Sequence, residues 1–160
     1  MRSPTEDTIV IETILHASIE NVWNAWTEPS IILKWFGSDP NGKGIKAKMD
    51  VRPDGHFEIT FANADGAEHT CFGIYREVKK FNELSFTWEW KNEPGVESFI
   101  TVKLTPIDHS TSMQFEHAQV GTASAHDYLI GWQSTFEKLE RVLGKKINDQ
   151  NRRSYNLVEF

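Results

Sequence analysis

Hydrophobic residues recur at alternating intervals of three and four along residues 124–143, the longest helical pattern in the chain. This spacing predicts an amphipathic α-helix with one apolar stripe. Ser124 is expected to cap its start, and Gly144 is expected to end it. A helix of about 20 residues is roughly 30 Å long, so it can cover one face of a sheet. The stripe consists of Leu129, Trp132, Phe136, Leu139 and Leu143.

Apolar and polar residues alternate singly along several other segments, as they do in β-strands with one buried face. The alternation is clearest in residues 84–90. The sequence Pro53-Asp54-Gly55 predicts a tight turn between two strands, in which Gly55 is expected to take a positive φ. The other strands are expected at 8–16, 46–52, 56–61, 70–78, 96–104 and 113–117, with the first of them at or near a sheet edge.

Two short helical patterns follow the first strand. Ser18 is expected to cap the first helix, and Pro29 is expected to start the second, which runs to about Trp35. The glycine-rich segment 37–44 then predicts a mobile loop. A strand, two short helices, about six consecutive antiparallel strands and a long final helix together predict the α+β fold class. We expect a single domain over residues 1–160, with its core at about 8–144 and a tail at 145–160.

Composition and charge narrow the classes of function. Lys and Arg number 17 against 23 Asp and Glu, and the net charge of −6 disfavours nucleic acid or an anionic membrane as the main partner. No apolar run is long enough to span a membrane, and residues 1–8 lack the apolar segment of a secretory signal. The single cysteine, Cys71, cannot form an internal disulfide, which predicts a cytoplasmic location.

His117 is the strongest candidate for chemistry, because its predicted strand face points it toward the covering helix. A histidine there can act as a general base, or it can be a hydrogen-bonded core residue, and the sequence supplies no partner carboxylate or nucleophile for it. The spacings of His, Cys, Asp and Glu match no metal-binding motif, and no glycine-rich phosphate loop follows a strand. We therefore assign no catalytic residue, no metal site and no cofactor.

The aromatic content is high, with ten Phe, three Tyr and six Trp in 160 residues. Aromatic side chains fill cores, and they also line pockets for flat or apolar ligands. A curved sheet and a helix across it need not fill the space between them, so a pocket on the order of 300–1,000 Å³ is expected. Gly131, beside Trp132, indicates either a close approach to the sheet or room for a guest. The residues expected to line this pocket are Trp35, Phe57, Ile59, Phe72, Phe86, Trp88, Met113, Phe115, His117, Trp132 and Phe136.

Several spaced motifs make the chain resemble a known family. The order of the predicted elements is similar to the helix-grip fold of the START-like (SRPBCC) superfamily. The motifs are most similar to the branch named after the activator of a heat-shock-protein ATPase, and the resemblance covers roughly residues 8–143. The motifs that carry it are 17–37 with Val22-Trp23, Glu28-Pro29 and Lys34-Trp35, then 49–57 with Arg52-Pro53, 71–78 leading to 84–90, Phe115-Glu116-His117, and Gly131-Trp132.

The resemblance implies a curved antiparallel sheet of about six to seven strands wrapped around a long C-terminal helix, with two short helices after the first strand. It also implies a hydrophobic cavity between the sheet and the helix. The superfamily includes lipid carriers, polyketide cyclases, hormone receptors and co-chaperone domains, so the shared fold by itself selects none of these functions.

We favour binding of an apolar or aromatic small molecule between the sheet and the C-terminal helix, in a non-catalytic carrier or sensor. One alternative is a cyclase- or hydrolase-like enzyme that uses His117 in the same cavity. The other is a co-chaperone-like interaction domain, and a chaperone partner ranks last because the sequence has no recognisable companion domain. A homodimer formed through strand 8–16 or through the tail 145–160 stays open.

Overall fold

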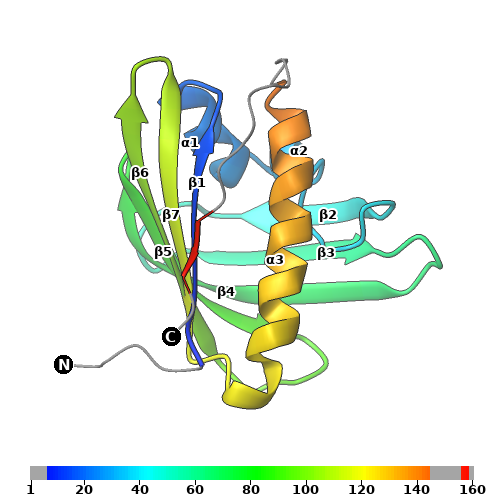
Figure 1. Ribbon diagram of the computed structural model, residues 1–160. Coiled ribbons are helices and arrows are strands. Elements are labelled where there is room, and N and C mark those ends of the chain that lie inside the picture. The colour runs from blue at the N-terminus through cyan, green and yellow to red at the C-terminus, as the bar shows by residue number, and fades with distance from the viewer. Residues whose placement is uncertain (1–6, 145–155, 159–160) are drawn as a thin grey trace.

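An antiparallel sheet of eight strands curves around the long helix α3 (Figure 1). The computed structural model describes residues 7–144 and 156–158, so the N-terminal end and most of the predicted tail lie outside the described residues. The strands are ordered β2-β3-β4-β5-β6-β7-β1-β8 across the sheet, which confirms the expected α+β helix-grip layout. The elements are β1 (Ile9–Leu15), α1 (Ile19–Thr27), α2 (Pro29–Ile32), β2 (Lys43–Met49), β3 (His56–Ala62), β4 (Glu68–Lys79), β5 (Glu83–Trp90), β6 (Ser98–Ile107), β7 (Ser110–Ala118), α3 (Thr122–Val142) and β8 (Asn156–Val158).

β1 alternates between buried and more exposed residues as predicted. It pairs with β7 on one side, where Ile11 lies opposite Phe115, and with β8 on the other side, where Ile11 lies opposite Leu157. β1 is therefore the last strand but one, near the edge of the sheet. Part of the predicted tail supplies the additional eighth strand.

α1 and α2 begin where the sequence predicts. The Ser18 hydroxyl caps α1 by accepting a backbone N–H of the first turn at 3.1 Å, and Pro29 is the first residue of α2. α2 ends at Ile32 rather than near Trp35, because the chain tightens and the N–H of Trp35 bonds the carbonyl three residues back. The indole N–H of Trp35 then donates to the carbonyl oxygen of Ala25 in α1 at 3.0 Å, which joins α1 to the segment that follows α2.

α3 starts two residues earlier than predicted, and its N-cap is Gly121 rather than Ser124. Gly121 has a φ of +85°, a conformation that glycine adopts at little cost. The hydrophobic stripe that predicted the helix does not extend into the first turn, so the pattern placed the start too late. The end agrees with the prediction, since Gly144 follows the last turn with a φ of +73°.

Several other strand boundaries and one turn differ from the prediction. β2 begins at Lys43, which shortens the expected loop, and β6 begins at Ser98, which leaves Val96 in a loop with 61% of its surface exposed. In the turn before β3 the positive φ, +69°, belongs to Asp54. Gly55 is required for a different reason, because a Cβ there would lie 2.0 Å from the carbonyl oxygen of Asp50.

β4 faces the opposite way from the prediction. Cys71 and Tyr75 point into the core and are buried, whereas Phe72 is half-buried on the outer face. The register with β3 explains this orientation, since Cys71 lies opposite the buried Ile59 and Phe72 lies opposite Glu58. Both faces of the strand carry apolar residues, so alternation alone did not decide between them. Phe72 therefore does not face the space between the sheet and α3.

Aromatic rings fill the space between the sheet and the second half of α3. Trp26 of α1 lies among them, with its ring centroid 4.9 Å from that of Trp35, 6.3 Å from Phe115 and 6.2 Å from Phe136. A void beside Trp26 measures about 10 Å³, which holds no more than one water. This part of the interior is a packed core.

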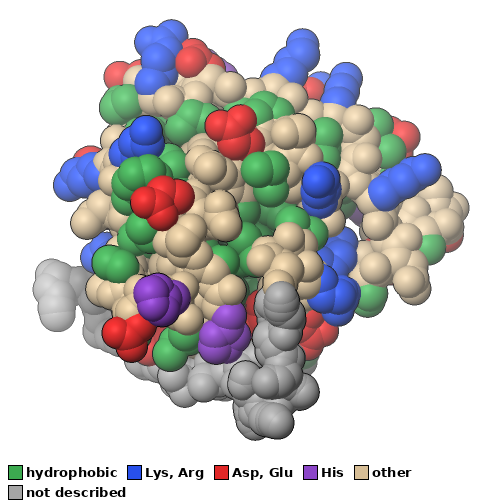
Figure 2. Space-filling model, turned by 90° about the horizontal axis from the view of Figure 1, so that it is seen from above, with side chains coloured by type: hydrophobic (Ala, Val, Ile, Leu, Met, Phe, Trp, Pro, Cys, Tyr) green, Lys and Arg blue, Asp and Glu red, His purple; other side chains and the backbone are tan. Residues whose placement is uncertain are grey.

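The surface carries charged side chains of both signs. On the face shown in Figure 2, Lys, Arg, Asp and Glu side chains are interspersed, with hydrophobic side chains between them. The large hydrophobic residues that are exposed in the described part of the chain come from five different segments, and single exposed apolar residues are ordinary. They are Ile14, Ile45, Val96, Ile107 and Ile130. None of the helices among the described residues has the length and apolar content to cross a membrane.

Candidate ligand-binding cavity

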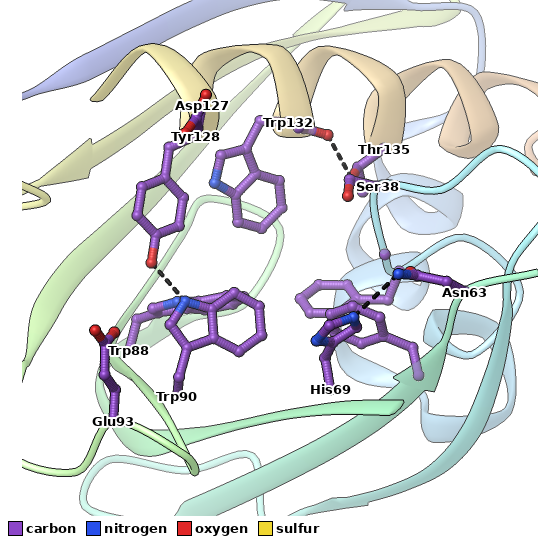
Figure 3. A pocket seen from close by; sticks show the side chains of 14 residues that line it. Ser38, Asn63, His69, Trp88, Trp90, Glu93, Asp127, Tyr128, Trp132 and Thr135 are labelled. Carbon is purple, nitrogen blue, oxygen red and sulfur yellow. Dashed lines mark hydrogen bonds between the residues drawn. The ribbon is translucent and has the colours of Figure 1, made fainter. Parts of the chain in front are cut away.

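A cavity of about 360 Å³ opens between the first half of α3 and the ends of β3, β4 and β5 (Figure 3). The loop that follows α2 forms another side. The volume lies within the range of small-molecule sites. The lining residues are Phe36, Gly37, Ser38, Phe61, Asn63, His69, Trp88, Trp90, Glu93, Asp127, Tyr128, Gly131, Trp132 and Thr135.

Four aromatic side chains from α3 and β5 form facing walls. Tyr128 and Trp132 hang from α3 toward the sheet, and Trp88 and Trp90 lie below them on β5 (Figure 3). A spacing of four on a helix and of two on a strand places each pair on one face. The ring centroids of Trp88 and Trp132 are 5.5 Å apart. Such flat, apolar surfaces suit a flat, apolar guest.

Gly131 leaves α3 without a side chain at the cavity. A Cβ built there would meet the Cβ of Ser38 at 3.4 Å, an ordinary contact, so the backbone does not require glycine at this position. One turn away the Ser134 hydroxyl donates to the carbonyl oxygen of Ser38 at 2.7 Å, which ties the loop to the helix. Gly131 therefore approaches a loop rather than the sheet, and its missing side chain leaves space beside Trp132.

Asp39 connects the same loop to the β3–β4 turn and to α3. Its carboxylate accepts the backbone N–H of Asn41 at 2.9 Å and that of Ala64, in the β3–β4 turn, at 2.8 Å. Its carbonyl oxygen accepts Nζ of Lys138 in α3 at 3.0 Å. The N–H groups of Ala64 and Asn41 lower the pKa of the Asp39 carboxyl, because they stabilise its charged form. The glycine-rich segment that was predicted to be mobile thus has fixed contacts at the cavity.

His117 lies behind the cavity wall and is fully buried. Its Nδ1 accepts the indole N–H of Trp132 at 3.0 Å, and its Nε2 lies 2.7 Å from Oγ of Ser98. An indole N–H can only donate, so Nδ1 is unprotonated and Nε2–H donates to Ser98. Burial lowers the pKa of His117 to about 3, which keeps the ring neutral at neutral pH. His117 is therefore the hydrogen-bonded core histidine, and it positions Trp132.

Tyr128 is bonded to the opposite wall. Its hydroxyl oxygen accepts the indole N–H of Trp90 at 2.6 Å, as Figure 3 shows. Burial raises the pKa of Tyr128, and the indole groups of Trp90 and Trp88 oppose that rise. The phenol is therefore protonated at neutral pH and can donate a hydrogen bond.

Polar side chains lie at the rim of the cavity. Nδ2 of Asn63 and Nε2 of His69 are 3.1 Å apart, and Glu93 and Asp127 are exposed. In the part of the chain that the structure describes, the lining includes these two carboxylates and no Lys or Arg. The mouth is therefore better suited to a neutral or positively charged guest than to an anion.

The sequence-predicted site residues lie in four different places. Trp88 and Trp132 line the cavity. His117 lies behind its wall, and Phe72 lies on the outer face of β4. The others are buried in the hydrophobic core, outside the cavity lining: Trp35, Phe57, Ile59, Phe86, Met113, Phe115 and Phe136. The prediction named the two surfaces that enclose the cavity, but it placed the hollow too deep.

Most of the lining was missed by sequence reasoning. Phe61 shared the inward face of its predicted strand, and Tyr128 lies four residues before Trp132 on the same helix face, so both carried a usable signal. Asn63 and Glu93 lie in the turns after β3 and β5. No periodicity applies to a turn, and their position depends on how the strand ends lie relative to α3.

The described residues form no group of three or more His, Cys, Asp or Glu side chains that could hold a metal. Two residues of the types that bind metals have other roles in the structure. His69 bonds to Asn63 at the cavity rim, and Cys71 is buried in the core, where burial raises the pKa of its thiol.

Comparisons with known proteins agree with this fold. The family model described as "Activator of Hsp90 ATPase homolog 1-like protein" matches residues 16–144. No curated protein matches the chain. Among solved structures, protein NE0264 from Nitrosomonas europaea has a TM-score of 0.76 at 22% identity, over 88% of this chain and 96% of NE0264. Protein CV1439 from Chromobacterium violaceum has a TM-score of 0.72 at 22% identity, over 87% of this chain and 99% of CV1439.

A third similar structure is DynU16, described as a protein in the dynemicin biosynthetic locus. Its TM-score is 0.71 at 18% identity, over 86% of this chain and 47% of DynU16. At these identities the likeness establishes a shared fold, and function has to be argued from the site.

Proposed function

The chain belongs to the family of Activator of Hsp90 ATPase homolog 1-like proteins, and we propose that it binds a small molecule. The proposed ligand is flat and apolar or aromatic, and it lies in the cavity beneath the first half of α3. In this proposal the protein is a non-catalytic carrier or sensor. The ligand lies between the aromatic walls of α3 and β5, and it enters past the loop that Asp39 holds.

The observation that carries the proposal is the aromatic lining of the cavity. Six of its side chains are aromatic rings, in a volume of about 360 Å³: Phe36, Phe61, Trp88, Trp90, Tyr128 and Trp132. Ligand sites are mostly apolar, with a few polar groups that orient the guest. Here the rim supplies those groups, through Asn63, His69 and the two carboxylates.

The enzyme alternative loses its main support. His117 does not line the cavity, and both of its ring nitrogens are engaged by Trp132 and Ser98. A base has to reach the proton that it removes. The co-chaperone alternative has no specific observation in its favour, since the exposed large apolar side chains of the described residues each come from a different segment of the chain. A cytoplasmic location and a homodimer stay predictions.

A thermal-shift screen with flat aromatic compounds and with lipids tests the proposal. We expect naphthalene-sized aromatic compounds to raise the unfolding midpoint of the wild-type protein and to quench its tryptophan fluorescence. The variant Gly131→Leu places a side chain at the cavity and is expected to lose both effects. Ile130→Leu is the matched control, because Ile130 is 51% exposed on the same helix and does not line the cavity.

Either of two results would contradict the proposal. One is a wild-type protein that responds to no compound in the screen. The other is a folded Gly131→Leu variant that responds as strongly as Ile130→Leu does.

A further inference from the structure

We propose that Tyr128 determines the ligand specificity of the cavity, by donating its hydroxyl hydrogen to an uncharged oxygen on a flat aromatic ligand. This inference rests on the proposed function, and it names the ligand class: aromatic ketones, esters and ethers rather than hydrocarbons or carboxylates.

The phenol oxygen of Tyr128 already accepts a hydrogen bond from β5. Trp90 donates its indole N–H to this oxygen at 2.6 Å. The indole nitrogen of Trp88 is buried without a hydrogen-bond partner among the described residues, and this indole opposes the rise in the pKa of Tyr128. An indole N–H cannot accept a hydrogen bond. The hydrogen of the phenol therefore has to be directed away from both tryptophans.

Nothing in the described part of the chain accepts that hydrogen. The one hydrogen bond of the Tyr128 hydroxyl to a described residue is the bond that it accepts from Trp90. A hydrogen-bond donor that is buried without an acceptor is unfavourable. An acceptor on a bound molecule would therefore stabilise the half-buried hydroxyl of Tyr128. The hydroxyl belongs to a cavity-lining residue, so a ligand oxygen can supply this acceptor.

The phenol is also held in place before any ligand binds. Its ring packs against the ring of His117, with centroids 4.7 Å apart, and His117 is itself fixed through its bond to Trp132. Tyr128 and Trp132 are therefore positioned by the same buried histidine. A donor that is fixed in advance loses less conformational freedom on binding, which favours affinity and directional recognition.

Charge at the mouth selects an uncharged acceptor. Among the described residues, Glu93 and Asp127 line the cavity and no Lys or Arg does so. A ligand carboxylate or phenolate would meet these two carboxylates with no cation of the described lining to compensate them, and juxtaposed like charges disfavour such partners. A neutral carbonyl or ether oxygen accepts the hydrogen of Tyr128 without this repulsion.

The test compares two probes of the same shape. 2-Acetylnaphthalene carries a carbonyl, and 2-isopropenylnaphthalene replaces its oxygen by a CH₂ group. Fluorescence titration gives the dissociation constant of each probe for the wild type, Tyr128→Phe and Tyr75→Phe. We expect the wild type to prefer the ketone by about 3- to 10-fold, as one net hydrogen bond implies. Tyr128→Phe should abolish this preference, whereas Tyr75→Phe removes a core phenol that does not line the cavity and should retain it.

The outcomes separate this inference from the proposed function. If the wild type binds both probes equally, or if Tyr128→Phe still prefers the ketone, the role of Tyr128 is wrong while ligand binding stands. If the wild type binds neither probe, the proposed function and the role of Tyr128 fail together. 2-Naphthoate, the anionic probe, should bind more weakly than the ketone, and tighter binding of 2-naphthoate would overturn the selection for an uncharged oxygen.

Discussion

The indole N–H of Trp132 donates to Nδ1 of His117 at 3.0 Å, and this bond joins the cavity wall to the core behind it. Trp132 lines the cavity, whereas His117 is fully buried and bonds Ser98 of β6 through its other nitrogen. The indole is thus anchored to the sheet through a histidine that does not line the cavity. A residue whose strand position suggested a general base serves instead to orient an aromatic wall.

The free energy of unfolding should fall between pH 7 and pH 5, partly because of His117. The buried ring stays neutral down to about pH 3, whereas the ring of the unfolded chain takes up a proton below about pH 6.5. The unfolded state therefore gains about 2 kcal/mol relative to the folded state at pH 5. Urea unfolding at both pH values measures this loss in the wild type and in His117→Asn.

The Asn variant keeps an acceptor for Trp132, but it cannot take up a proton. Its stability should therefore fall less between the two pH values than that of the wild type. The remaining histidines are common to both proteins, so their contributions cancel in the comparison. An equal loss in both proteins would contradict a neutral, buried His117.

Ser98→Ala should destabilise the protein by about 1–3 kcal/mol, because it leaves the Nε2–H of His117 buried without an acceptor. Ser98 is itself buried, so water is poorly placed to replace the hydroxyl. Urea unfolding at pH 7 measures the change. Ser98→Thr retains the hydroxyl and serves as the control. If Ser98→Thr lost as much free energy of unfolding as Ser98→Ala, the effect would be one of packing.

Gly131→Ala should stabilise the protein by about 0.5–1 kcal/mol, since alanine restricts the unfolded chain more than glycine does. The added Cβ meets Ser38 at an ordinary contact distance, so no clash opposes the gain. Thermal or urea unfolding measures the change. A destabilised Gly131→Ala would mean that the helix and the loop approach each other more closely than the structure has them.

Cys71 should be unreactive in the native protein. The thiol is fully buried, and burial raises its pKa, so little of the reactive thiolate forms. Ellman's reagent should therefore release one equivalent of chromophore in denaturing urea and almost none in buffer. Rapid reaction under native conditions would place the inner face of β4 within reach of solvent.

The fold could be predicted because its signals are periodic and repeated. The apolar stripe that contains Phe136 and Leu139 predicted α3, and the alternation in β5 predicted a strand with an inward aromatic face. Such patterns establish an element and its faces, but they leave its ends less well defined. The N-cap of α3 at Gly121 and the early start of β2 are errors of this kind.

The cavity was harder to predict because it depends on which inward residues meet one another. Phe57 and Phe61 alternate on the same face of β3, yet only Phe61 lines the cavity. The difference arises from position along the strand, since Trp26 of α1 helps to fill the space near Phe57 and the opposite end stays open. The inward orientation predicted for Phe72 was wrong for another reason, because a strand with apolar residues on both faces has no unique inward side.

The central claim is that ligands bind beside α3 and β5 and not in the deeper core, and the six tryptophans report on both places. Trp88, Trp90 and Trp132 line the cavity, whereas Trp23, Trp26 and Trp35 do not. The most direct measurement is a two-dimensional ¹H–¹⁵N spectrum of the indole N–H groups during titration with 2-acetylnaphthalene. We predict shifts in the three cavity signals and unchanged signals from the other three. Shifts confined to Trp26 and Trp35, or no shifts at saturating ligand, would contradict the account.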